Sequence, residues 1–340
     1  MASYLLACCL LAPIPGQHTD NTIQPVTMMD EEQFHSAISP IEEHAEEHYD
    51  ETACCDQLCW SCLCGPLAGR DDDPIDQLTM FMGLDGSKQP QDLGINAHLG
   101  GRFATNYSTA LFSEYGIGAQ VGFAFNYSDS AVRVLELVEG AKERFQTFTT
   151  VGLFRNGDRL KFGMVYDWSS TNYYDNYDLS QWRGRLGYVI NPCHELGVWW
   201  AIGDRADRTF FNGPLGPEFF NLEPMSQVSF YWRQTWENAI ETSLWLGVNE
   251  GHGEVIATLP GNPSVNQRMS FGADVHIPVS DVLAIFGEAN FVAPSDSGSV
   301  DSYLGFAYYP RGGARRGRTS RYSAILPVAS NPTMTVDLRR

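Results

Sequence analysis

The chain has 340 residues and a formal net charge of −19 at pH 7, and this acidic balance argues against nucleic acid as a partner. No apolar run reaches the roughly 18 residues of a membrane-spanning helix, but a membrane-spanning β-strand needs to be apolar on one face only. The motifs G-x-S-x-G, H-E-x-x-H and the P-loop are absent from the sequence, so no catalytic site, cofactor or metal is predicted.

The first 73 residues contain 14 Asp or Glu and one Arg. Residues 1–16 have the apolar core of a possible signal segment, without a basic start. Residues 17–73 read as an acidic, Cys-rich linker or plug segment, disordered or partly helical, although His44 and His48 on a helix could hold a divalent metal. For the cysteines the alternatives are local disulfides, metal binding or no defined role: Cys54, Cys55, Cys59, Cys62 and Cys64.

From residue 74 to residue 310 the sequence repeats a strand pattern. Apolar residues alternate with small or polar ones over about 9–11 residues, which is the length of a strand that crosses a bilayer in a closed barrel. We predict a twelve-stranded antiparallel up-and-down transmembrane β-barrel. The twelve predicted strands are 78–85, 94–106, 116–127, 145–154, 159–168, 181–190, 195–203, 225–233, 239–249, 268–277, 282–292 and 300–309.

The connections between these strands support a membrane barrel. Those after the fourth, sixth, eighth and tenth strands are tight, whereas those after the third, fifth, seventh and ninth are long: 128–144, 169–180, 204–224 and 250–267. Barrels in outer membranes have short periplasmic turns and longer extracellular loops. This phase predicts that both ends of the chain lie on the periplasmic side.

The alternation also sorts the side chains into two faces. The lipid-facing set is apolar: Ile95, Leu99, Phe103, Ile117, Val121, Phe123, Leu160, Phe162, Met164, Leu186, Val198, Trp200, Ile240, Leu244, Leu246, Phe271 and Ile285. The other face carries charges of both signs, which lipid would not tolerate. The predicted lumen-lining residues are His98, Arg102, Lys161, Asp167, Arg183, Arg185, Glu241, Asp274, His276 and Glu288. Five of these are candidates for setting the lumen charge: Arg102, Arg183, Arg185, Asp274 and Glu288.

The tail, residues 311–340, contains five arginines between Arg311 and Arg321. We expect a solvated, flexible Arg-rich tail, and the alternatives are binding of phosphate, of lipid headgroups or of the acidic N-terminal segment.

Four motifs resemble an uncharacterised planctomycete family of outer-membrane-barrel-like cell-envelope proteins over about residues 77–310. They are Gly83-Leu84-Asp85-Gly86-Ser87-Lys88-Gln89-Pro90, Gly118-Ala119-Gln120-Val121-Gly122, Gln181-Trp182-Arg183-Gly184 and Phe286-Gly287-Glu288-Ala289-Asn290-Phe291. The resemblance implies a barrel in the cell envelope and assigns no activity or site residues.

The sequence therefore predicts a barrel in the cell outer membrane, with the lipid bilayer and small solutes as partners. Its expected role is a porin-like channel or a structural envelope protein. One alternative is a barrel-mouth hydrolase using His98 or His276 beside Glu288 or Asp274. Another is a soluble β-barrel that serves as a binding scaffold.

Overall fold

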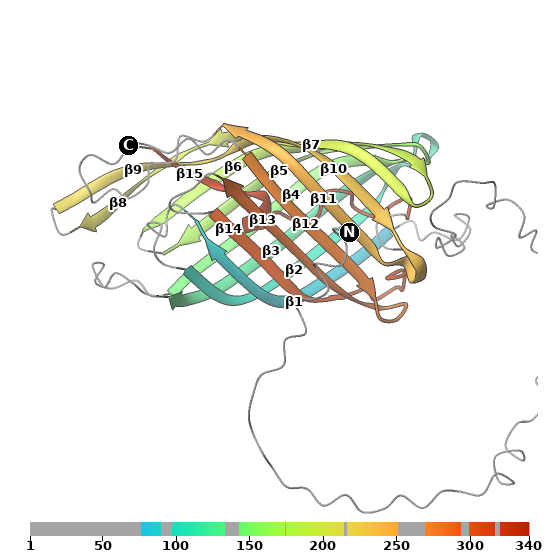
Figure 1. The fold of residues 1–340 in the computed structure, drawn as a ribbon, viewed down its shortest axis with the longest axis horizontal. Helices are drawn as coiled ribbons and strands as arrows, with labels where there is room; N and C mark the ends of the chain where they lie inside the picture. The colour runs from blue at the N-terminus through green and yellow to red at the C-terminus, as the bar shows by residue number, and fades with distance from the viewer. Residues whose placement is uncertain are drawn as a thin grey trace, which may run out of the picture. The chain divides into compact units, whose positions relative to one another are not determined.

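A computed structural model describes residues 76–89, 97–132, 143–173, 175–213, 216–250, 269–293, 299–316 and 320–339. In this part of the chain, twelve antiparallel strands form a closed barrel, as the sequence predicts (Figure 1). Each strand pairs with the next barrel strand along the chain. None of the described helices is long and apolar enough to cross a membrane. The expectations for residues 1–73 lie outside the described residues.

The barrel strands keep the order of the sequence. They are β1 (Asp76–Lys88), β2 (Ala97–Phe112), β3 (Ile117–Val132), β4 (Glu143–Asn156), β5 (Leu160–Asn172), β6 (Asn176–Asn191), β7 (His194–Arg205), β10 (Ser226–Thr235), β11 (Glu241–Glu250), β12 (Met269–Pro278), β13 (Leu283–Ala293) and β14 (Ser299–Tyr308). The barrel closes where β1 pairs antiparallel with β14, in a register running from Met80 opposite Tyr308 to Lys88 opposite Val300. No strand edge of the barrel is therefore left unpaired.

The two ends of the barrel differ. One end, called here the short-turn end, carries the connections 113–116, 157–159, 192–193, 236–240 and 279–282, together with the start of β1 and the end of β14. The opposite end, the long-loop end, carries the connections 133–142 and 251–268 and the chain between β7 and β10. The connection after β5 breaks the predicted rhythm, because only residues 173–175 separate β5 from β6.

Several strands are longer than the sequence predicts. β2, β3 and β6 each have 16 residues, whereas β10, β11 and β14 each have 10. At about 3.4 Å per residue, a 16-residue strand extends well beyond what a bilayer crossing needs. β2 is extended at the short-turn end, to Phe112, whereas β3 to β6 are extended at the long-loop end. At the long-loop end the outward side chains change from aromatic to polar, for example from Tyr127 to Asp129 and from Trp168 to Asn172.

The outward face of the barrel is apolar. Of the predicted lipid-facing set, eleven side chains are exposed: Leu99, Val121, Phe123, Leu160, Phe162, Met164, Leu186, Val198, Leu244, Leu246 and Phe271. Phe103, Ile117, Trp200, Ile240 and Ile285 are half-buried between neighbours, and Ile95 lies outside the described residues. Aromatic side chains stand near both ends, with Tyr188 and Trp232 at the short-turn end and Trp168 and Trp182 toward the long-loop end. An apolar belt between aromatic girdles is the outer surface of a transmembrane barrel.

A second, smaller sheet replaces the predicted loop 204–224. β8 (Asp207–Gly213) and β9 (Gly216–Pro224) form a hairpin at the long-loop end, and β15 (Val336–Arg339) pairs with β9 (Figure 1). The register places Val336 opposite Pro224 and Leu338 opposite Leu222. The chain's last described strand therefore lies at the long-loop end.

The expectation of a solvated tail is wrong for most of residues 311–340. Residues 320–337, called here the luminal segment, run through the inside of the barrel. Near the short-turn end, the amide of Ala314 donates to the carbonyl of Asp281, and Asn156 donates to the carbonyl of Ser320 at 2.6 Å. At the long-loop end, the amide of Met225 donates to the carbonyl of Thr335 at 2.8 Å. The described C-terminal end is consequently not at the short-turn end, contrary to the prediction.

Candidate functional site

The lumen is occupied by the chain itself. The luminal segment is largely buried, and Ile325, Ala329, Asn331 and Asp337 are at most 1% exposed. Apart from the 3-10 turn Asn331–Thr333, its residues up to Thr335 form no regular secondary structure. Buried main-chain groups without a ladder need other partners. Here the polar side chains of the barrel wall supply them.

Inward-facing glycines make room for this segment. A Cβ added at Gly122 on β3 would lie 2.6 Å from the Cβ of Val328, and one at Gly163 on β5 would lie 2.9 Å from the Cδ1 of Ile325. Real Cβ atoms do not approach so closely. Small residues at these inward positions are therefore required by the segment that passes them.

Apolar side chains of the luminal segment also pack against the wall. Val328, Ala329, Met334 and Val336 belong to the largest buried cluster, together with inward residues that include Phe81, Phe148 and Tyr303. Ile325 and Leu326 form a second cluster with Phe154 and Val165. The interior is thus a packed core around an extended chain rather than a water-filled channel.

The first ionic group of the wall joins Asp167 to Arg183. Arg183 donates from Nε and Nη2 to the two oxygens of Asp167, at 2.8 and 3.0 Å, in a bidentate pair. Thr150 Oγ1 also donates to Asp167, at 2.6 Å. Arg183 and Thr150 also bond to the luminal segment. Arg183 donates to the carbonyl of Pro327 at 2.7 Å, and Thr150 accepts from the amide of Ala329 at 3.0 Å.

The second ionic group surrounds one carboxylate. Glu195 on β7 contacts Lys161 at 3.0 Å, Arg185 at 3.0 Å and Arg233 at 3.4 Å, and it accepts a hydrogen bond from Tyr231 at 2.6 Å. The Arg185 guanidinium also lies 4.0 Å from the centre of the Tyr231 ring. These side chains come from four adjacent strands, so the group ties β5, β6, β7 and β10 together on the inside of the barrel.

A third group of polar wall side chains bonds to the luminal segment around Ala329 and Asn331. Arg102 on β2 donates to Asn126 and to the carbonyl of Ala329, both at 3.0 Å, and its guanidinium lies 5.0 Å from the Tyr303 ring centre. Nearer the long-loop end, the Asn331 amide group donates to Asp85 at 3.0 Å and to Gln146 at 3.1 Å. The wall therefore contacts Asn331 through the Asn331 side chain, whereas it contacts Ala329 through the Ala329 main chain.

The ten predicted lumen-lining residues all have limited exposure. Seven are buried: His98, Arg102, Lys161, Asp167, Arg183, Glu241 and His276. Arg185, Asp274 and Glu288 are half-buried. Asp274 on β12 lies opposite Glu288 on β13 in the strand register, and the Tyr303 hydroxyl donates to Glu288 at 2.6 Å. The structure brings Arg102 and Arg183 to the luminal segment directly.

The two histidines of the hydrolase alternative lie apart in the structure. His276 forms a 2.9 Å hydrogen bond with the Tyr309 hydroxyl, and the His98 ring packs edge-on against Tyr173. His98 lies at the long-loop start of β2 and His276 near the short-turn end of β12. Among the described residues, no group of three or more His, Cys, Asp or Glu is placed to hold a metal.

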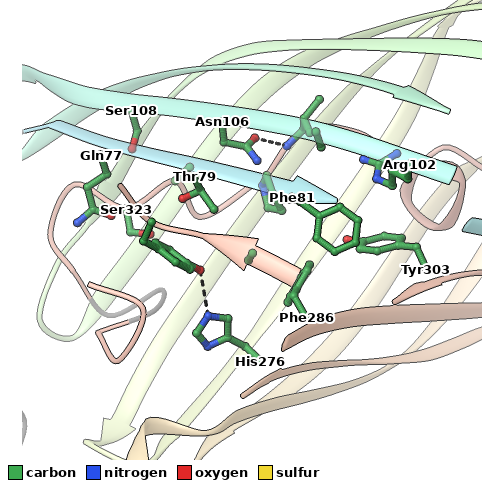
Figure 2. A pocket seen from close by; sticks show the side chains of 16 residues that line it. Gln77, Thr79, Phe81, Arg102, Asn106, Ser108, His276, Phe286, Tyr303 and Ser323 are labelled. Carbon is green, nitrogen blue, oxygen red and sulfur yellow. Dashed lines mark hydrogen bonds between the residues drawn. The ribbon is translucent and has the colours of Figure 1, made fainter. Parts of the chain in front are cut away.

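Small cavities border the luminal segment. One of them, about 80 Å³, lies between the segment and the wall formed by β1, β2 and β12 to β14. Figure 2 shows Phe81, Phe286 and Tyr303 grouped together, with Arg102 beside them and His276 next to Phe286. Another cavity, about 60 Å³, is lined by Arg183, Asp274 and Glu288 among others. Cavities of this size hold a few water molecules.

Sequence reasoning missed several interior charges. Asp85, Arg144, Glu195, Arg233 and Asp301 are all buried. A signal for two of them was present, because Glu195 and Arg233 alternate with outward residues such as Val198 and Trp232. The partners that the C-terminal residues provide could not be foreseen, since no periodicity marks that segment as part of the barrel.

These features define a transmembrane-type β-barrel whose lumen is closed by its own C-terminal segment. The chain belongs to a family of unknown function (DUF6666), whose model matches residues 77–336 and so includes the luminal segment up to Val336.

No curated protein matches this sequence. Among solved structures, the translocator domain of the autotransporter NalP from Neisseria meningitidis is similar at 12% identity and a TM-score of 0.42, covering 68% of this chain and 87% of that one. The KdgM porin matches at 9% identity and a TM-score of 0.37, covering 67% of this chain and 98% of that one. LpxR from Salmonella typhimurium matches at 10% identity and a TM-score of 0.36, covering 68% and 99%. Because the TM-scores and identities are this low, no property of these proteins is assigned to this chain.

Proposed function

We propose that this protein is an outer-membrane barrel of the porin-like type, held closed by its luminal segment. The apolar outer belt and the closed strand order support placement in a bilayer, and the short-turn end is then periplasmic. The observation that carries the closed state is the position of residues 320–337 inside the barrel. The same placement fits the cell-envelope resemblance of its sequence motifs.

The interior favours a removable closure over a permanently filled core. Most of the ionic contacts join one wall strand to another, so they remain in place if the luminal segment leaves. The Asp167–Arg183 pair and the Glu195 group, for example, lie entirely within the wall. A wall that keeps its own charge pairs can surround a watery passage, and twelve strands give a wider interior than the filled eight-stranded barrels.

Truncation after Pro310 tests this proposal. The full chain in a planar lipid bilayer is expected to show no steady conductance. The chain lacking residues 311–340 is expected to show stable single-channel openings, because the segment that fills the lumen is gone. If the truncated barrel folds, as judged by its resistance to unfolding in SDS, but stays closed, the channel role is wrong and a structural envelope role remains.

A point substitution tests the same idea in the full-length chain. Gly122→Leu places a side chain where Val328 now lies, so we expect the luminal segment to be displaced and conductance to appear. Gly101→Leu is the matched control. A Cβ at Gly101 meets nothing within 4 Å, so this variant should remain closed. Equal behaviour of the two variants would contradict closure by the luminal segment.

A further inference from the structure

The wall of the lumen recognises the main chain of the segment that it holds. Eight carbonyl groups of the luminal segment accept hydrogen bonds from the barrel: those of Ser320, Tyr322, Leu326, Pro327, Ala329, Asn331, Thr333 and Thr335. Seven of the donors are side chains of the wall: Asn156, Ser108, Gln120, Arg183, Arg102, Gln89 and Gln181. Donors of this kind would serve any extended peptide, because every residue has a carbonyl group.

Two amide groups of the segment are recognised in the same way. Val328 N–H donates to Asn106 Oδ1 at 2.6 Å, and Ala329 N–H donates to Thr150 Oγ1 at 3.0 Å. The Val328 contact is drawn in Figure 2, where Asn106 points from β2 toward the segment. Asn106 and Arg102 lie on the same inward face of β2, so one strand supplies both an acceptor and a donor.

Among the polar side chains of the segment, Asn331 makes two buried bonds to the wall. Its amide group donates to both Asp85 and Gln146, and all three side chains are buried. Other polar side chains make single bonds: Ser320 accepts from Gln77, Thr335 accepts from Asn290 at 3.5 Å, and Arg321 donates to the carbonyl of Ser113 at 3.5 Å. Most other side chains of the segment that touch the wall are apolar and pack in its buried clusters.

We propose that the lumen is a binding site for an extended polypeptide, recognised chiefly through its main chain and anchored by one Asn. Its own residues 320–337 occupy the site in cis, and a separate peptide of this sequence can occupy it in trans. A helix satisfies its own main-chain groups and would leave the wall's donors unpaired. The bound chain runs from the short-turn end to the long-loop end, so the site has a direction. This inference rests on the proposed closure and identifies what the channel accepts.

The test adds a synthetic peptide of residues 320–337 to the barrel lacking residues 311–340. We expect the peptide to block its conductance and, when fluorescently labelled, to bind the barrel in detergent. N-methylation at Val328 and Ala329 removes two buried donors and should weaken binding about 100-fold. Asn331→Asp in the peptide should weaken it by a similar factor, because a carboxylate would face Asp85.

The matched control peptide carries Ile325→Val, which shortens one buried apolar side chain and leaves every main-chain group in place, so its affinity should fall less than about 10-fold. A loss as large as that from N-methylation would overturn recognition through the main chain. If the truncated barrel conducts but neither is blocked by the peptide nor binds it, the binding site is refuted while the channel stands. If the truncated barrel does not conduct, the channel proposal fails, and the binding measurement in detergent still decides the peptide site.

Discussion

Glu195→Gln is expected to destabilise the barrel by about 3–5 kcal/mol. Glutamine has the same size, so the change removes charge and little volume. It leaves Lys161, Arg185 and Arg233 close together in the interior without the carboxylate that they share. Breaking a buried ion pair from one side costs more than the pair contributes, because the remaining charges stay desolvated. Urea unfolding in detergent, followed by tryptophan fluorescence, measures the change in free energy.

Glu114→Gln provides the control for this prediction. Glu114 is an exposed carboxylate in the turn between β2 and β3, so its replacement should change the unfolding free energy by less than about 0.5 kcal/mol. A Glu195→Gln barrel as stable as this control would show that the three cations are not held together by Glu195. A double variant that also carries Arg233→Met should recover part of the loss, since one of the three desolvated cations is then absent.

Leu246→Arg is expected to destabilise the barrel in lipid by about 2–4 kcal/mol. Leu246 lies in the middle of β11, faces outward and is 56% exposed, with Phe230 and Phe271 opposite it on the neighbouring strands. An arginine near the bilayer midplane has to leave water or draw water into the lipid. Reversible unfolding from lipid vesicles by guanidinium measures the effect.

The location of the substitution is the decisive variable in this experiment. Asn176→Arg adds the same side chain at an exposed position at the long-loop start of β6, so it should cost less than about 1 kcal/mol. A soluble barrel would expose both positions to water and tolerate both arginines equally. Equal stability of the two variants would therefore contradict a membrane-embedded belt and favour the soluble alternative.

The barrel strands were predictable because the outward face of each strand is mainly apolar, while the inward face carries many small or polar residues. Leu244, Leu246 and Val248 on β11 alternate with Ser243, Trp245 and Gly247, and that alternation survives in the structure as an outer and an inner face. Strand ends were less predictable. The prediction for β5 stopped at Trp168, where the outward face loses its apolar residues, but the hydrogen-bonded ladder with β6 continues to Asn172.

The luminal segment could not be recognised from its own pattern. Residues 320–337 have neither the period of a strand nor that of a helix, because their contacts are set by the surrounding wall on all sides. The indirect signal lies in the barrel strands, where Gly122 and Gly163 occupy inward positions that a side chain could otherwise fill. Of the interior charges, Asp167 and Arg183 were found from alternation, but the bond from Arg183 to the carbonyl of Pro327 needed coordinates.

Because the luminal segment follows β14, its position constrains the order of assembly. β14 and β1 form the junction that closes the ring, and the residues that must end up inside are attached to one side of that junction. Either they lie between the two wall halves before the junction forms, or the free end is drawn through a finished ring. In the first route, the strands of the wall pack around the luminal segment before β1 and β14 pair. A chain shortened after Pro310 would then close more slowly, and β1 and β14 would be the last strands to gain protection from hydrogen exchange.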